Sequence, residues 1–445
     1  MSSWKEYKLG EIATFYNGRA YKNTEFKVSG TPIVRIQNLT GEGKIVYSDL
    51  NLDENKYIDY GDLIYAWSAT FGPYIWKGEK SIYHYHIWKI ICNEELLDKK
   101  YFYYKLKQIS DNLKDSGGNG SIFVHITKAF MENFKVKIPS LNEQKRVSSI
   151  LAYLDEKIQL NTQINQTLEQ IAQTIFKSWF IDFDPVHAKA NALASGQTTE
   201  QATQAAMTVI SGKNTQELHR LQTANPKQYQ QLWEIAEAFP SGVDEEGVPW
   251  GWEEKPLPEL IDFLEGPGIR NWQYTEEEDG IKFINIRCIK NGDLSLETAN
   301  KITREEAFGK YAHFQLKEDD IVISTSGTLG RFALVRNEHL PLCLNTSVIR
   351  FRPIENKSTL AFLLGLASNQ LQYELEARAS GSVQRNFGPT HLKQISVLLP
   401  DFYLLSLHNK YISTLFELRK SNLRENDLLM KTRDVLLPKL LSGEV

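Results

Sequence analysis

The chain of 445 residues runs twice through one plan, and this internal repeat constrains its fold more than any other feature. The segment WKEYKLGEI from Trp4 returns as WEEKPLPEL from Trp252, at an offset of 248 residues. GTPIVRIQNL returns as GIKFINIRCI at an offset of 250, and GDLIYAWSATFG returns as DDIVISTSGTLG at 258. A fourth block ends at Pro139 and again at Pro400, at an offset of 261. Because the order holds and the offset grows only in loop-sized steps, we infer two homologous halves, about 4–181 and 252–445.

Each half begins with short β-like runs and ends in a long helix. The runs Ile33 to Ile36, Leu63 to Ala66 and Ile321 to Ser324 are β-like and are bounded by Gly, Asp and Asn turns. After Pro139 and after Pro400 the pattern becomes helical, and the first helix has no internal Pro or Gly for about nine turns. The sequence therefore predicts an α+β protein with two homologous β-rich domains.

Five segments follow from this pattern. The segment between the halves is rich in Ala, Gln and Thr, and we expect helices over 199–238 and a loop over 240–251. It is longer than a linker requires, so the role of 195–240 is left open. We predict a first β-rich domain at 1–140, a first long helical region at 141–181, an inter-repeat segment at 182–251, a second β-rich domain at 252–400 and a second long helical region at 401–445.

Both helices carry apolar residues at the a and d positions of a heptad, which favours a coiled-coil-like pairing. Two Asn residues interrupt each apolar seam, and the two sets are related by the offset of 261. Facing Asn pairs would fix the register of two antiparallel helices, which would then act as a spacer. The alternative is that each helix packs on its own domain with solvated Asn residues. The pairing positions are Leu151, Leu154, Ile158, Asn161, Asn165, Leu168 and Ile175 on the first helix, and Ile412, Leu415, Asn422, Asn426, Leu429 and Leu436 on the second.

Composition and charge exclude several classes of protein. Lys plus Arg is 51 and Asp plus Glu is 55, and the resulting net charge of -4 excludes a uniformly basic coat but not a local basic patch. Cys92, Cys288 and Cys343 are odd in number and far apart, so a disulfide framework is not expected. No run approaches the 18 or so apolar residues of a membrane helix, and the N-terminus lacks the apolar core of a signal peptide. We expect a cytoplasmic protein without a membrane partner.

Signatures of catalysis are missing from the sequence. It contains no G-x-x-x-x-G-K-[ST] phosphate loop and no Asn-Pro-Pro-aromatic motif of amino-methyltransferases. His84 and His86 would share one face of a strand near Cys92, but two histidines without a carboxylate or paired thiols are weak evidence for zinc. We therefore predict no catalytic residue and no metal site.

Four stretches carry a resemblance to a known family. They are Ile138 to Ile158, Ser178 to Ala190, Ser324 to Arg331 and Leu436 to Val445, which read IPSLNEQKRVSSILAYLDEKI, SWFIDFDPVHAKA, STSGTLGR and LLPKLLSGEV. With two β-rich halves each closed by a Pro and a long helix, the chain resembles the specificity subunit of type I restriction–modification enzymes. The resemblance covers most of the chain.

The resemblance implies a non-catalytic subunit with two target recognition domains, each reading one half of an asymmetric, interrupted sequence in double-stranded DNA. Two methyltransferase subunits that carry S-adenosylmethionine would pack on the helical regions. Restriction subunits that use ATP and Mg would join them, so no cofactor is expected in this chain. Helices of about 30 residues would be about 45 Å long, which suits two readers about one DNA turn apart. Neither the bases read nor the length of the unread spacer follows from the sequence, nor does the presence of a restriction subunit.

Side chains that read base edges must lie on exposed turns, and Arg, Lys, Asn, Gln, Ser and Thr are the types that do so. For each residue the alternative is a solvated turn or a backbone cap. We favour Arg331 and Arg385, because each is a lone cation on a turn that contains Gly or Ser. In the first half we select Arg19, Tyr21, Lys22, Ser68, Thr70, Asn119, Ser121 and His125, and in the second half Arg270, Asn271, Trp272, Ser324, Ser326, Thr328, Arg331, Ser382, Gln384, Arg385 and Asn386.

Partner surfaces are expected on the helices. A second apolar stripe on the first helix contains Leu160, Ile164 and Ile171, which would pack either on a partner or on the inter-repeat segment. An alternative function also remains: a non-catalytic duplicated scaffold that assembles two partner subunits without reading DNA sequence. Aromatic and leucine clusters at the helix ends are further candidates for an interface: Phe176, Trp179, Phe180 and Phe183, and Leu436, Leu437, Leu440 and Leu441.

Overall fold

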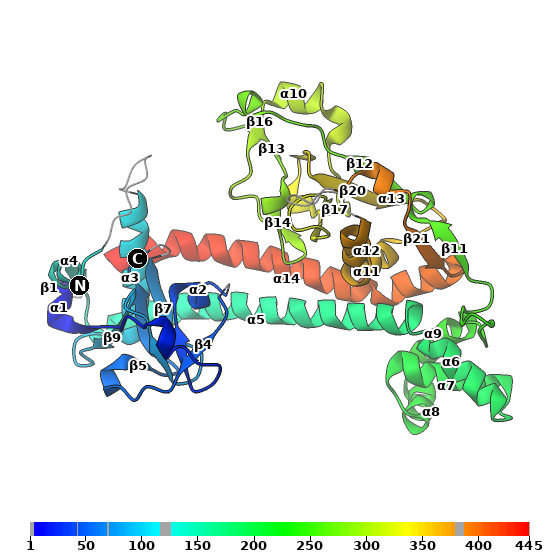
Figure 1. Ribbon diagram of the computed structural model, residues 1–445, viewed down its shortest axis with the longest axis horizontal. Helices are drawn as coiled ribbons and strands as arrows, with labels where there is room; N and C mark the ends of the chain where they lie inside the picture. The colour runs from blue at the N-terminus through cyan, green and yellow to red at the C-terminus, as the bar shows by residue number, and fades with distance from the viewer. Residues whose placement is uncertain (1–3, 42, 69–70, 116–125, 379–386, 445) are drawn as a thin grey trace. The chain divides into compact units, whose positions relative to one another are not determined.

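The computed structural model divides into two compact units, which are described separately (Figure 1). Unit 1 contains residues 1–161 and 425–445, and unit 2 contains residues 162–424. The residues that the structure describes are 4–41, 43–68, 71–115, 126–378 and 387–444.

In unit 1 the β-rich domain (residues 1–140, domain 1) is built on two four-stranded sheets. One has the order β2-β9-β6-β7 with antiparallel neighbours, and the other has the order β4-β3-β8-β5 with β3 parallel to β8. These strands are β2 (Ala13–Asn17), β9 (Ile87–Cys92), β6 (Leu63–Ala66), β7 (Gly72–Ile75), β4 (Val46–Ser48), β3 (Thr31–Val34), β8 (Ser81–Tyr83) and β5 (Tyr57–Ile58).

The described part of domain 1 also contains a further strand pair and four α-helices. The pair joins the start and the end of the domain, because β1 (Lys5–Lys8) is antiparallel to β10 (Lys135–Ile138). The predicted β run at Ile33 to Ile36 is too long, since β3 ends at Val34 and the next helix begins at Ile36. The helices are α1 (Leu9–Ile12), α2 (Ile36–Leu39), α3 (Lys99–Asp115) and α4 (Lys128–Asn133).

In unit 2 the β-rich domain (residues 252–400, domain 2) repeats this topology. Its four-stranded sheet has the order β12-β20-β17-β18, and β13 is parallel to β19 as β3 is to β8. The strands are β12 (Ile261–Glu265), β20 (Val348–Pro353), β17 (Ile321–Ser324), β18 (Phe332–Leu334), β16 (Lys301–Ile302), β13 (Ile281–Phe283), β19 (Leu342–Cys343), β14 (Ile289–Lys290), β15 (Asp293–Leu294), β11 (Glu253–Pro256) and β21 (Ser396–Leu399), and the helices are α10 (Arg304–Phe308), α11 (Leu360–Asn369), α12 (Leu371–Arg378) and α13 (Pro389–Leu392).

The central strands are continuous apolar runs because both faces of the sheet are covered. In β17, Ile321 and Ile323 face one hydrophobic core while Val322 belongs to another. In β6, Leu63 and Tyr65 face the main core of unit 1 and Ile64 belongs to a smaller one. Strands that are buried on both faces lose the alternation of polar and apolar residues, which is why these runs were recognisable in the sequence.

Each long helix contributes to both units: α5 (Leu141–Phe180) and α14 (Phe402–Ser442). In unit 1 their segments are antiparallel, and the Asn161 side-chain amide donates a hydrogen bond to Asn426 at 3.0 Å. The guanidinium of Arg433 pairs with Asp155 at 2.9 Å. Leu151 and Leu154 are buried, and Ile158, Leu429 and Leu436 are half-buried.

The segments of α5 and α14 in unit 2 pair in the same antiparallel sense. The Asn422 amide donates to the Asn165 side-chain oxygen at 2.9 Å, and both side chains are buried. Leu168 and Ile412 are buried beside them, while Ile175 and Leu415 are half-buried. The predicted facing Asn pairs are thus present in each unit, and the solvated alternative is wrong.

The inter-repeat segment of unit 2 folds into four helices: α6 (Asp184–Ala194), α7 (Thr199–Ser211), α8 (Thr215–Ala224) and α9 (Pro226–Ala238). The helices expected over 199–238 are α7 to α9, and α6 lies before that range. A buried ammonium holds the segment together, because Lys189 donates to the main-chain carbonyls of Phe239 at 2.5 Å and Ala236 at 3.2 Å. A cation at these carbonyls caps the C-terminus of α9.

Two clusters that were predicted as partner surfaces are core instead. Phe176, Trp179 and Phe180 are 1%, 1% and 5% exposed, within the main hydrophobic core of unit 2, and Phe183 is half-buried against that core. Leu437, Leu440 and Leu441 are likewise buried in the core of unit 1, with Leu436 packed against it. These residues cannot serve as exposed anchors, because their own units already cover them.

One polar side chain lies inside that aromatic core of unit 2. The His408 ring is fully buried, with its centroid 4.9 Å from that of Phe180 and 5.3 Å from that of Trp179. Neither ring nitrogen has a hydrogen-bond partner among the described residues. Burial lowers the pKa of His408 to about 3, so the imidazole is neutral in the folded protein.

Candidate nucleic-acid interface

Three loops of domain 1 meet at one end of its four-stranded sheet. One loop follows β2, one follows β6 and one connects β8 to β9. At this end of the sheet Asn17 is paired with Trp88, and Ala66 is paired with Ile87. Main-chain hydrogen bonds join the loops: Gly18 N to Ile87 O at 3.1 Å, Tyr85 N to Arg19 O at 3.0 Å and Trp67 N to His86 O at 3.1 Å. We call these three loops and their bonds the loop frame of domain 1.

The loop frame requires a glycine where the loop after β2 comes closest to the connection between β8 and β9. A Cβ atom on Gly18 would lie 2.2 Å from the main-chain oxygen of His84, far inside van der Waals contact. A side chain at this position would therefore push the β8–β9 connection away from the loop after β2.

Aromatic and imidazole rings gather on the frame of domain 1. The ring centroid of Tyr85 is 3.9 Å from that of His86 and 4.4 Å from that of His84, and the Trp67 indole nitrogen donates to the Tyr85 carbonyl at 2.8 Å. Tyr85 remains 40% exposed. Burial, together with the neighbouring His86, lowers the pKa of His84 to about 4, so this ring is neutral near pH 7. His86 lies on the turn and His84 forms an isolated parallel bridge with Arg19, so the two histidines do not share a strand as predicted.

Domain 2 contains the same loop frame. Gly266 N donates to Val348 O at 3.2 Å, Thr346 N to Pro267 O at 2.8 Å and Thr325 N to Ser347 O at 2.9 Å. These three bonds match those of domain 1 at the offsets 248, 258 and 261 that the sequence repeat gave. A Cβ on Gly266 would lie 2.1 Å from the main-chain oxygen of Asn345, as on Gly18 against His84.

A cation occupies the same position beside each frame. Lys22 precedes the 3₁₀ turn Asn23–Glu25, and its N–H donates to Glu25 at 2.8 Å. Arg270 precedes the 3₁₀ turn Asn271–Gln273, and its N–H donates to Gln273 at 3.0 Å. Both side chains are exposed, as are the neighbouring Asn271 and Trp272, the latter at 80%. The match to Arg270 is thus Lys22.

Two of the residues selected in domain 1 have partners within the domain. Arg19 forms an ion pair with Glu25 at 2.6 Å and is half-buried. The Tyr21 hydroxyl donates to the Tyr83 carbonyl at 3.4 Å, and the Arg19 guanidinium lies 5.2 Å from the Tyr21 ring centroid. Ser68 is half-buried on the loop after β6. Arg19 and Tyr21 therefore order this loop and are less free to reach DNA than Lys22.

The turn after β17 shows one error of the sequence analysis. Ser324 was expected on an exposed turn, but it ends strand β17 and is 0% exposed. Its hydroxyl donates to the Thr328 carbonyl at 2.6 Å and accepts from the Arg331 main-chain N–H at 2.9 Å. Ser324 therefore closes the turn that presents Thr328 and Arg331, which are exposed, while Ser326 is half-buried.

The remaining selected residues lie outside the described residues, so their placement stays a prediction. They are Thr70, Asn119, Ser121, His125, Ser382, Gln384, Arg385 and Asn386.

Sequence reasoning did not select the tips of the frames, the residues Tyr85 and Thr346. Both are exposed, and they correspond at the offset of 261. The signal that could have found them is the pair Gly18 and Gly266, which correspond at the offset of 248 and mark where two loops touch.

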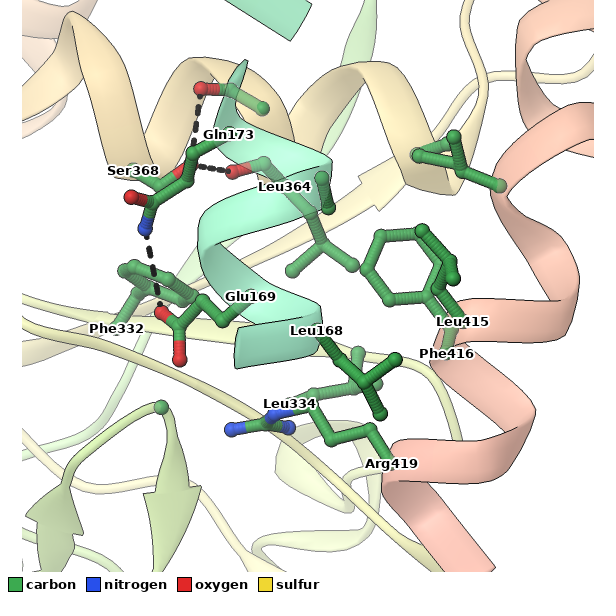
Figure 2. A pocket seen from close by; sticks show the side chains of 15 residues that line it. Leu168, Glu169, Gln173, Phe332, Leu334, Leu364, Ser368, Leu415, Phe416 and Arg419 are labelled. Carbon is green, nitrogen blue, oxygen red and sulfur yellow. Dashed lines mark hydrogen bonds between the residues drawn. The ribbon is translucent and has the colours of Figure 1, made fainter. Parts of the chain in front are cut away.

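Other site types find no support in the described part of the chain. Within it there is no group of three His, Cys, Asp or Glu side chains that could hold a metal ion. No helix in the same ranges is long and apolar enough to cross a membrane. A cavity of about 40 Å³ in unit 2 is lined mostly by apolar side chains of α5, α11, α14 and β18, with Arg419 at one side (Figure 2). That volume suits one or two small molecules the size of water rather than an organic substrate.

Comparison with known proteins identifies the family. A model of the type I restriction modification DNA specificity domain matches residues 1–170 and 249–419. The chain belongs to the type I restriction–modification specificity subunits. It is a DNA specificity subunit with two domains, as the repeat and the resemblance predicted.

Curated relatives carry the same description. The type I restriction enzyme HindI specificity subunit of Haemophilus influenzae is 32% identical, with 100% of both chains covered. The MjaIX specificity subunit of Methanocaldococcus jannaschii is 23% identical over 78% of this chain and 68% of that relative.

A solved structure supports the fold. The type I restriction–modification S subunit from M. genitalium superposes with a TM-score of 0.52 at 15% identity, covering 99% of this chain and 96% of that chain. The predicted α+β architecture, with two homologous domains and long helices, is thereby confirmed.

Proposed function

We propose that each domain of this specificity subunit reads one half of a bipartite, asymmetric DNA target. The observation that carries the proposal is the loop frame that occurs twice in one chain, with matching main-chain bonds and different side chains at the tips. One scaffold with two sets of side chains suits two different half-sites, because base edges are distinguished by side-chain donors, acceptors and methyl contacts. Arg331, on the turn after β17, and Arg385, which lies outside the described residues, remain our candidate base readers in domain 2.

Lys22 and Arg270 are proposed to contact phosphates near their half-sites. Each is an exposed cation at an equivalent position beside a frame. Phosphate contacts position a protein on DNA without reading sequence, and they suit a position that is basic in both domains.

The test is selection from a random double-stranded DNA library by the full chain, purified with its methyltransferase partner. We expect two short specified blocks separated by a gap of fixed length. Enrichment of no sequence, despite a stable complex with the methyltransferase, would support the alternative of a scaffold that does not read DNA.

The partner subunits are proposed to carry all bond chemistry. Two methyltransferase subunits would bring S-adenosylmethionine, and restriction subunits would bring the ATP- and Mg-dependent steps. We propose that the methyltransferases bind the exposed apolar side chains of α5. Leu160 in unit 1 is 50% exposed and Ile171 in unit 2 is 41% exposed, so both are accessible to a partner.

Charge insertion tests this surface. Leu160→Glu is expected to weaken co-purification of the methyltransferase, because a carboxylate would have to be desolvated in an apolar contact. Gln163→Glu places the same charge at an exposed polar position of α5 and serves as the control. Equal recovery of the methyltransferase with both variants would place the interface elsewhere.

A further inference from the structure

The tips of the two loop frames present different chemistry from one backbone position. Tyr85 in domain 1 and Thr346 in domain 2 are exposed, and each donates its main-chain N–H to the loop that follows the first strand of its sheet. The acceptors, Arg19 O and Pro267 O, also correspond at the offset of 248. The two side chains therefore leave their frames from equivalent points.

The flanking residues hold each tip in place. Beside Tyr85, the rings of His84 and His86 lie at centroid distances of 4.4 and 3.9 Å. Beside Thr346, the buried Asn345 accepts the Ile269 N–H at 3.2 Å through its side-chain oxygen. A loop that is already ordered loses little conformational entropy on binding, which favours recognition over general attraction.

Both side chains are suited to base edges but to different ones. The Tyr85 ring offers an apolar face for a thymine methyl and a hydroxyl for one hydrogen bond. Thr346 offers a small methyl and a hydroxyl that donates and accepts. Neither side chain is charged, so neither contributes the sequence-independent attraction that Lys22 and Arg270 provide.

We propose that Tyr85 and Thr346 are equivalent specificity-determining residues, each contacting one base pair of its own half-site in the major groove. This inference rests on the proposed function, since it names the residues that distinguish the two half-sites. The frame keeps the approach to DNA constant, while the tip residue sets which base pair is accepted.

The test uses the full chain with its methyltransferase partner and duplexes that carry every single base-pair change in the selected target. Tyr85→Thr is expected to reduce discrimination about tenfold or more at one position of the first half-site, with the second half-site unchanged. Thr346→Tyr is expected to alter one position of the second half-site alone. Tyr60→Thr makes the first substitution at a tyrosine that is 76% exposed elsewhere in domain 1, and it should change no position.

Three results would overturn the inference. They are unchanged discrimination in both variants, an equal loss on all duplexes, and a change in the wrong half-site. Circular dichroism and methyltransferase binding show whether Tyr85→Thr impairs folding. If it does, Thr346→Tyr and the milder Tyr85→Phe are used to test the inference instead. A wild-type complex that selects no two-part target would instead refute the proposed function, so the two failures can be told apart.

Discussion

Breaking the buried Asn165–Asn422 pair is expected to reveal a strong energetic coupling between the two long helices in unit 2. The Asn422 amide donates to Asn165 at 2.9 Å, and Asn165 and Asn422 are 7% and 8% exposed. Asn165→Ala leaves the amide of Asn422 buried without this partner, which costs about 1–3 kcal/mol of unfolding free energy. Asn422→Ala likewise leaves the buried Asn165 side-chain oxygen without this partner, at a similar cost in unfolding free energy.

The double variant removes both amides, so neither is left unsatisfied. Its loss should be smaller than the sum of the two single losses by about 1–2 kcal/mol. Replacing both residues with Leu should raise the unfolding free energy above that of the wild type, because a polar pair in an apolar seam fixes register at the expense of stability.

Urea denaturation followed by circular dichroism measures these differences. Gln163→Ala, at an exposed position of α5, is the control and should stay within about 0.5 kcal/mol of the wild type. Losses that add within about 0.5 kcal/mol in the double Ala variant would refute the coupling. A Leu pair less stable than the wild type would refute the stated role of the Asn residues.

Three further perturbations have expected outcomes. Gly266→Ala should abolish discrimination in the second half-site, since its Cβ meets the Asn345 carbonyl, whereas Gly268→Ala meets nothing within 4 Å and should bind like the wild type. Burial lowers the pKa of His408 from 6.5 to about 3, so stability should fall by up to about 1.4 kcal/mol per pH unit as pH drops from 6.5 toward 3. The His408→Leu variant should not show this loss of stability when its denaturation is measured over the same pH range. Lys22→Ala should weaken binding to all duplexes alike and reduce the slope of log Kd against log salt by about 1.

The architecture could be predicted from the sequence, because the internal repeat indicates two similar domains and the heptads indicate two paired helices. The offset is constant within each block, so it shows which elements of the two halves correspond. The two Asn residues in each apolar seam indicate which positions of the two helices face each other. The hydrogen bonds of Asn161 to Asn426 and of Asn165 to Asn422 follow from that spacing. Length and composition also indicated helices between the halves, although α6 lies before the predicted range.

Single site residues were harder to predict, because exposure depends on tertiary contacts. Ser324 resembles a turn residue, yet it is the last residue of β17 and its hydroxyl closes the turn. Arg19 resembles a free cation, but Glu25 pairs with it. The aromatic residues at the end of α5 face inward because α9 and α11 contribute to the same core.

The tips of the loop frames were missed for a related reason. Tyr85 and Thr346 lie in short turns that share no residue type, and nothing in either turn alone marks it as equivalent to the other. Their equivalence becomes visible through the hydrogen bonds to loops about 65 to 80 residues earlier in the chain.

The central claim is that this chain supplies a two-part DNA address. Long-read sequencing can map methylated adenines in cells that express the methyltransferase partner, with and without the chain. The account predicts a motif of two specified blocks around a fixed gap, present only when the chain is expressed. No motif, or one uninterrupted motif, in cells that contain a soluble complex of the chain with the methyltransferase would contradict it.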